Sequence, residues 1–144
     1  MLRGLHLLLS ATLAGAATWT ATVGGIGAVS VDLDDFAYSV SAGGAPWLMQ
    51  GRVAVQCGGR RFDTEAAGGL VGGTIAIANG TDAALGAFEA VRRGWRTEPP
   101  CTDFTTEVRQ YAAAAGGREG SGGVEFVTTM GSSGANGTAT EPQL

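Results

Sequence analysis

The sequence contains no lysine, a single histidine and only two cysteines among its 144 residues. The histidine, His6, lies in an N-terminal segment that has the pattern of a cleaved signal peptide. Without that segment the chain has neither histidine nor lysine, which excludes a Ser-His-Asp triad, a Cys-His dyad, a histidine-based metal site and a lysine Schiff base. We therefore expect no catalytic residue of these classes, no metal site and no cofactor in the mature chain.

The N-terminal segment, residues 1–16, is predicted to be a signal helix that is removed after Ala16. Arg3 gives it a positive start, residues 5–13 are apolar, and residues 14–16 form a small-residue cleavage site. The apolar part is shorter than the roughly 20 residues that cross a membrane, so we expect no membrane span. A buried N-terminal strand or helix is the alternative. Cleavage would remove Arg3, change the net charge from −4 to −5 and place the protein in the secretory pathway or outside the cell.

Positive charge is scarce as well. All nine basic residues are arginine, and only residues 60–61 and 92–93 form basic pairs. Nucleic-acid binding calls for clustered positive charge, so we expect no nucleic-acid partner. The densest acidic group, Asp32, Asp34 and Asp35, offers the oxygen ligands that Ca²⁺ prefers but lacks the later ligands of an EF-hand loop. A solvated acidic turn is favoured over a calcium site.

The two cysteines, Cys57 and Cys101, predict one disulfide. An even number of cysteines in a secreted chain is typical of paired thiols, and the bond would close a long loop and limit the freedom of the unfolded chain. Two unpaired thiols are the alternative, because sequence alone does not place the two side chains within bonding distance.

Short segments of alternating apolar and polar residues, separated by glycine pairs, predict an all-β protein. We expect one antiparallel β-sandwich over residues 17–130 and a flexible tail over residues 131–144. Residues 64–73 and 97–103 read as loops, and residues 45–49 as a turn or an edge segment because they include Pro46. The expected strands are residues 17–23, 28–33, 36–41, 52–57, 60–63, 74–78, 104–112 and 124–129.

The strongest local pattern is residues 72–96, which we expect at the centre of the sheet. A β-branched run ends at Asn79-Gly80, a pair typical of a tight hairpin turn and also the start of an N-glycosylation sequon. A second sequon begins at Asn136. The following segment, Asp82–Arg96, has apolar residues at helical spacing but contains two glycines, so its residues leave helix and strand equally open.

Five short motifs follow one another in the second half of the chain: Asn79-Gly80-Thr81-Asp82, Leu85-Gly86-Ala87-Phe88, Trp95, Thr106 to Tyr111, and Val124-Glu125-Phe126. Their order resembles the N-terminal β-supersandwich domain of alpha-galactosidase and raffinose-synthase-like glycoside hydrolases, over residues 74–129. The resemblance implies a strand at Asp82–Arg96 and a partial supersandwich. In that family the catalytic carboxylates lie on a C-terminal barrel, so a missing catalytic domain is an implied partner and no catalytic residue transfers to this chain.

A candidate carbohydrate site is Trp95, Arg109 and Tyr111, since Arg109 and Tyr111 point the same way on an alternating strand and can hydrogen-bond a sugar beside an indole. Ordinary pairing on the sheet face is the favoured alternative for these side chains. The leading functional hypothesis is a secreted, non-catalytic β-sandwich module, or a truncated N-terminal part, of a carbohydrate-active protein. The alternative is a glycosylated extracellular structural or cell-surface domain without a ligand. The third hypothesis is a small carboxylate-based enzyme that uses Asp82 with Glu89, or Glu107 with Glu125.

Overall fold

The computed structural model describes residues 17–23, 27–65, 67–112, 122–131 and 137–138. Throughout these residues the regular structure is β-strand, and the strands form three antiparallel sheets, which confirms the all-β prediction and is consistent with a β-sandwich. The predicted signal helix, the sequon at Asn136 and most of the predicted tail lie outside the described residues. No helix in the described part is long and apolar enough to cross a membrane.

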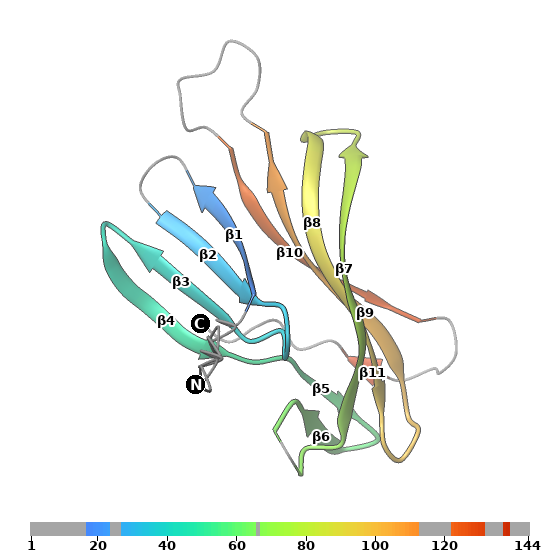
Figure 1. Ribbon diagram of the computed structural model, residues 1–144. Coiled ribbons are helices and arrows are strands. Elements are labelled where there is room, and N and C mark those ends of the chain that lie inside the picture. Colours follow the sequence, from blue (N-terminus) through green and yellow to red (C-terminus); the bar gives the residue numbers. More distant parts are fainter. Residues whose placement is uncertain (1–16, 24–26, 66, 113–121, 132–136, 139–144) are drawn as a thin grey trace, which may run out of the picture.

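Two four-stranded sheets pack against each other, with a smaller sheet at one end (Figure 1). The first sheet has the order β1-β2-β3-β4, with β1 (Thr18–Val23), β2 (Gly27–Asp32), β3 (Tyr38–Ala42) and β4 (Ala45–Gly51). The second has the order β10-β9-β8-β7, with β7 (Leu70–Asp82), β8 (Gly86–Thr97), β9 (Asp103–Tyr111) and β10 (Val124–Met130). The small sheet has the order β11-β5-β6, with β5 (Ala54–Cys57), β6 (Arg60–Asp63) and β11 (Gly137–Thr138).

Glycine pairs form the tight turns of two hairpins, as their sequence predicts. Gly43-Gly44 joins β3 to β4, and Gly58-Gly59 joins β5 to β6. All four glycines have φ between 58° and 77°, the left-handed region that glycine enters without steric cost. The proline-containing segment is an edge strand, because β4 is the last strand of its sheet.

β8 makes residues 86–97 a strand, which agrees with the strand that the resemblance implies for most of Asp82–Arg96, but the position of the hairpin turn is corrected. Asn79-Gly80 lies within β7, and the turn falls between Asp82 and Gly86. Asp82 Oδ1 accepts the backbone N–H groups of Ala84 and Leu85 at 2.8 and 3.0 Å, and these bonds hold the pKa of the Asp82 carboxyl below its ordinary value. β7 begins at Leu70, inside the segment expected to be a loop. The prediction that residues 72–96 form the centre of the sheet holds for β8, which has a neighbour on each side, but not for β7, which is an edge strand.

Gly80 lies in β7 directly beneath the aromatic ring of a residue in the neighbouring strand β8. Gly80 is the register partner of Phe88, and a Cβ atom added at Gly80 would overlap the Phe88 ring. The same relation joins Gly51 to Tyr38 in the first sheet. Glycine is needed at these positions because an aromatic side chain covers the backbone, and the φ angle plays no part.

We expect Gly80→Ala to destabilise the protein by about 1–3 kcal/mol, because the added methyl forces Phe88 out of its place. Gly94→Ala is the matched control: Gly94 also lies in a strand of this sheet, but a Cβ there meets nothing within 4 Å. Its substitution should be neutral or slightly stabilising, since alanine loses less backbone entropy than glycine. Urea unfolding of the two variants measures the difference, and equal stability of both would contradict the packing role of Gly80.

The hydrophobic core lies between the two large sheets and extends to the small one. Phe36 meets the edge of Trp95 with ring centroids 5.9 Å apart, and Tyr38 meets Phe126 at 5.3 Å. The buried members of the core cluster are Trp19, Ala21, Val29, Val31, Phe36, Tyr38, Val55, Cys57, Phe62, Val91, Trp95, Phe104 and Val108.

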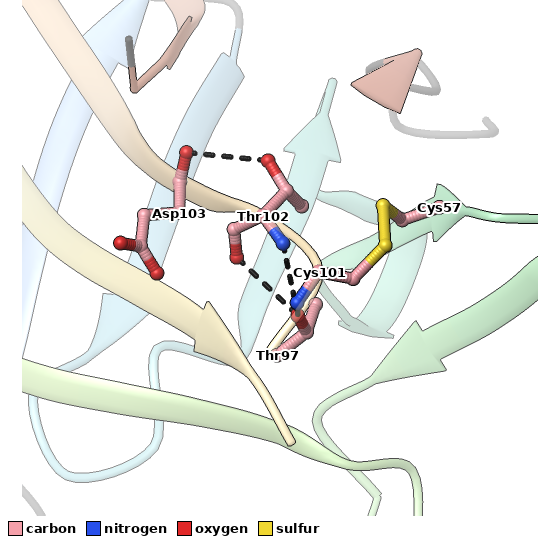
Figure 2. The surroundings of a disulfide bond; sticks show 5 residues. All are labelled: Cys57, Thr97, Cys101, Thr102 and Asp103. Carbon is pink, nitrogen blue, oxygen red and sulfur yellow. Dashed lines mark hydrogen bonds between the residues drawn. A yellow bond between two sulfur atoms is a disulfide. The ribbon is translucent and has the colours of Figure 1, made fainter. Parts of the chain in front are cut away.

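The predicted disulfide is present and joins the small sheet to the second sheet (Figure 2). Cys57 ends β5, Cys101 lies in the connection between β8 and β9, and their Cα atoms are 6.2 Å apart. Thr97 Oγ1 organises this connection, since it accepts the backbone N–H groups of Cys101 and Thr102 at 2.7 and 3.1 Å. The side chain of Thr97 is almost fully buried.

Candidate functional site

Two of the predicted carbohydrate-binding residues, Arg109 and Tyr111, lie together on the outer face of the second sheet. Arg109 Nε donates to Glu107 Oε2 at 2.8 Å, and its Nη1 lies 3.6 Å from Glu125 Oε2. The Tyr111 hydroxyl donates to the same Glu125 oxygen at 2.7 Å. The structure thus brings Glu107 and Glu125 together as well, with the Arg109 guanidinium shared between them.

The ring of Phe88 completes this outer-face cluster. The Arg109 guanidinium carbon lies 4.6 Å from the Phe88 centroid, and the Tyr111 ring lies at 5.5 Å. The hydrogen bond to Glu107 is the main reason why the pKa of Arg109 is raised. Arg109 and Glu107 are only 21% and 18% exposed at their side chains. Because these polar groups bind one another, the cluster has the character of a cross-strand network that stabilises the sheet.

Trp95 does not lie beside this cluster. It is the register partner of Phe104 and faces the core, where it is 4% exposed. Its indole N–H donates to Thr106 Oγ1 at 2.8 Å, and the Arg93 guanidinium lies 4.9 Å from the ring centroid. The expected grouping of Trp95 with Arg109 and Tyr111 is therefore corrected: the sheet separates the indole from the other two side chains.

The other acidic residues that the sequence singled out, apart from Asp34, have partners in turns or in another strand. Asp82 caps the β7–β8 turn, whereas Glu89 accepts the Trp19 indole N–H, so this expected carboxylate pair has two unrelated tasks. Asp32 and Asp35 each accept a backbone N–H two residues on, which is the geometry of an acidic turn. Within the described part of the chain no group of three acidic, histidine or cysteine side chains is arranged to hold a metal ion.

The two tyrosines of the chain provide a pH-dependent prediction. The hydrogen bond to Glu125 raises the pKa of Tyr111, and burial raises the pKa of Tyr38. A folded pKa above the unfolded value of about 10 means that the stability these groups contribute is complete below that pH. It is then lost as the pH rises from about 10 through the folded pKa values.

We therefore expect the tyrosinate absorbance of the folded protein to appear only above the pH at which it appears in urea. Tyr38→Phe and Tyr111→Phe each leave one tyrosine, so their titrations assign the two groups. A tyrosine that titrates near pH 10 in the folded Tyr38→Phe variant would contradict the hydrogen bond between Tyr111 and Glu125.

A second group of polar side chains, which sequence reasoning missed, crosses the inner face of the second sheet. Asn79 is the register partner of Glu89, and Glu89 is the register partner of Gln110, so the three form one line across β7, β8 and β9. We call these three residues the polar row. Neighbouring strands lie about 4.8 Å apart, so the row extends over about 10 Å. Sequence reasoning missed this group because only the register of the three strands brings the residues together, and no local sequence pattern reveals that register.

The polar row lines an open depression of about 520 Å³, together with Gly80, Ala87, Phe88, Tyr111 and Ala112. Asn79 and Glu89 are exposed, and Gln110 is half-buried. Glu89 Oε1 accepts the Trp19 indole N–H at 2.7 Å, and Gln110 Nε2 lies 3.5 Å from Thr22 in β1. These contacts place Glu89 and Gln110 beside β1, and the depression extends from them to Phe88 and Tyr111 of the outer-face cluster.

The chemistry of the polar row suits a ligand rich in hydroxyl groups. The two amide side chains both donate and accept hydrogen bonds, and the carboxylate of Glu89 accepts them. A hydroxyl group does both, so each member of the row can pair with it. The volume of the depression lies within the range of small-molecule sites, and most of its lining surface is apolar, as is usual for such sites.

Comparisons with protein-family models, with curated proteins and with solved structures found no match to this chain. The resemblance to the sandwich domain of alpha-galactosidase-like enzymes therefore stays a prediction.

Proposed function

We propose that this chain is a secreted, non-catalytic β-sandwich module that binds a saccharide through the polar row. The observation that carries the proposal is the register of β7, β8 and β9, which sets Asn79, Glu89 and Gln110 side by side along an open depression. Three amide and carboxylate groups over about 10 Å match the length and hydrogen-bonding character of a short saccharide better than those of an apolar ligand.

Two further points support the cellular setting and the ligand class. The Cys57–Cys101 disulfide fits an oxidising compartment, which agrees with the signal peptide expected at residues 1–16. The resemblance of residues 74–129 to an accessory supersandwich favours a carbohydrate ligand, and it makes a separate catalytic domain a proposed partner.

The proposal is tested with the emission of Trp19, whose indole N–H is bound to Glu89. Titration with a panel of galactose, glucose, mannose and their disaccharides should give a saturable change for at least one sugar. Gln110→Ala should weaken that binding at least tenfold, while Arg92→Gln, an exposed change on the opposite face of β8, should leave it unchanged. Loss of the emission change in the Trp19→Phe variant would show that Trp19 is the tryptophan that reports binding.

Absence of any saccharide response, or equal affinity in the Gln110→Ala variant, would overturn the proposal. Isothermal titration of the same sugars gives a second readout that does not depend on tryptophan emission.

A glycosylated extracellular domain without a ligand is the second candidate, and the placement of Asn79 favours it. Asn79 is exposed, begins the sequon Asn79-Gly80-Thr81 and belongs to the polar row, so a glycan attached there would occupy the same depression. Protein secreted from eukaryotic cells should then lose mass on treatment with an N-glycosidase, and Asn79→Gln should lack that difference. A glycan at Asn79 together with no binding of free sugar selects this function over the first.

A further inference from the structure

A second cavity lies on the same face of β9 as Gln110, further along the strand, and shares no residue with the polar row. It is lined by residues of β3 and the turn before it, the segment that joins β4 to β5, β5, and strands β9 and β10 of the second sheet. Its volume is about 50 Å³, which is several times the space that one water molecule requires. The cavity is therefore large enough to hold a small group of a ligand, and it exceeds the void that one missing methyl group would leave.

The walls of this cleft are mostly apolar and include four aromatic rings. Phe36, Tyr38, Phe104 and Val108 are buried around it, and Phe126, which is 39% exposed, stands at its rim. Such walls gain free energy when an apolar group displaces water from them. The side of the cleft that faces solvent is not closed, since Phe126 and Thr128 are both exposed.

One cation lies at the mouth of the cleft. Arg52, in the segment between β4 and β5, is exposed and lines the cleft beside Val53. Among the described residues Arg52 has neither an ion pair nor a hydrogen bond, whereas Arg93, Arg96 and Arg109 all have partners. Glu107 also borders the cleft, but its carboxylate is bound to Arg109 on the outer face.

We infer that this cleft binds a small carboxylate that has a short alkyl or aryl tail. The tail enters between Phe36, Phe104 and Phe126, and the carboxylate pairs with the Arg52 guanidinium at the mouth. A guanidinium binds a carboxylate through two parallel hydrogen bonds, which fixes the orientation of the ligand as well as its charge. Apolar walls with a single free cation at the opening select an anionic amphiphile over a sugar or a cationic ligand.

The experiment compares hexanoate, hexanol and hexylamine as probes of the whole chain by isothermal titration and amide NMR shifts. We expect saturable binding of hexanoate, weaker binding of hexanol and none of hexylamine, with shifts at the lining residues of β9 and β10. Arg52→Gln should weaken hexanoate binding at least tenfold and leave hexanol binding unchanged. Arg92→Gln, which removes an exposed arginine from the outer face of β8, is the matched control and should change neither.

A second variant tests the cleft without touching the charge. Thr128→Phe places a ring at the exposed rim and should abolish binding of both hexanoate and hexanol, while Thr129→Phe on the other face of β10 should not. Binding of hexanoate that survives Thr128→Phe, or an equal loss of hexanoate and hexanol affinity in Arg52→Gln, would overturn the inference. So would the absence of saturable binding by hexanoate.

Discussion

Trp95→Ala is expected to lower the free energy of unfolding by about 3–5 kcal/mol, a large part of the total stability of a domain of this size. The indole is 4% exposed, lies against Phe36 and donates its N–H to Thr106. Its removal leaves a cavity between the sheets and deletes a hydrogen bond in the core. Urea unfolding, followed by far-ultraviolet circular dichroism, measures the loss.

The chain provides its own control for this experiment. Trp47 lies on the edge strand β4 and is 75% exposed, so Trp47→Ala should change stability by no more than about 0.5 kcal/mol. Trp95→Phe should fall between the two, because it keeps an apolar ring but loses the bond to Thr106. If Trp95→Ala left the stability unchanged and abolished sugar binding, Trp95 would be a ligand contact and its core role would be wrong.

Loss of the disulfide is the second large effect that we expect. Cys57 and Cys101 are 44 residues apart. Closing such a loop reduces the conformational entropy of the unfolded chain, which raises its free energy by about 4 kcal/mol in the chain-entropy model. The double variant Cys57→Ala, Cys101→Ala should therefore lose about 2–5 kcal/mol. The bond also joins the small sheet to the rest of the core, so hydrogen exchange should rise most in β5 and β6.

Thermal unfolding with and without a reducing agent checks this expectation. The reducing agent should lower the midpoint for the native sequence and have no effect on the double variant. An unchanged midpoint for the native sequence under full reduction, verified by thiol titration, would contradict a stabilising role of the bond.

The parts of the fold that sequence predicts well are those that short-range chemistry determines. Gly58-Gly59 sets the β5–β6 turn, and Gly43-Gly44 sets the β3–β4 turn, because both pairs adopt left-handed backbone. Asn79-Gly80 misled the same reasoning, since it has the composition of a turn but lies under the Phe88 ring. The helical spacing of apolar residues within Asp82–Arg96 left the secondary structure open, because only pairing with β7 and β9 decides it.

The candidate sites depend on register, which a single sequence does not contain. Arg109 and Tyr111 lie on one strand, so alternation alone places them on one face. Trp95 lies on the next strand, and its face follows from its pairing with Phe104 across the β8–β9 connection. To predict the polar row, one must know the register of three strands at once. To predict the cleft beside Arg52, one must know which residues of the two large sheets are in contact. Neither follows from local pattern.

The aromatic rings over Gly80 and Gly51 have a consequence for how the sequence can diverge. Each glycine is acceptable only while its partner ring lies over it, and each ring is well packed only while the partner lacks a side chain. Phe88 with Gly80, and Tyr38 with Gly51, should therefore be inherited as coupled pairs: a larger residue at the glycine becomes tolerable after the ring has been replaced by a small side chain. The order in which two mutations arise then decides whether the intermediate folds.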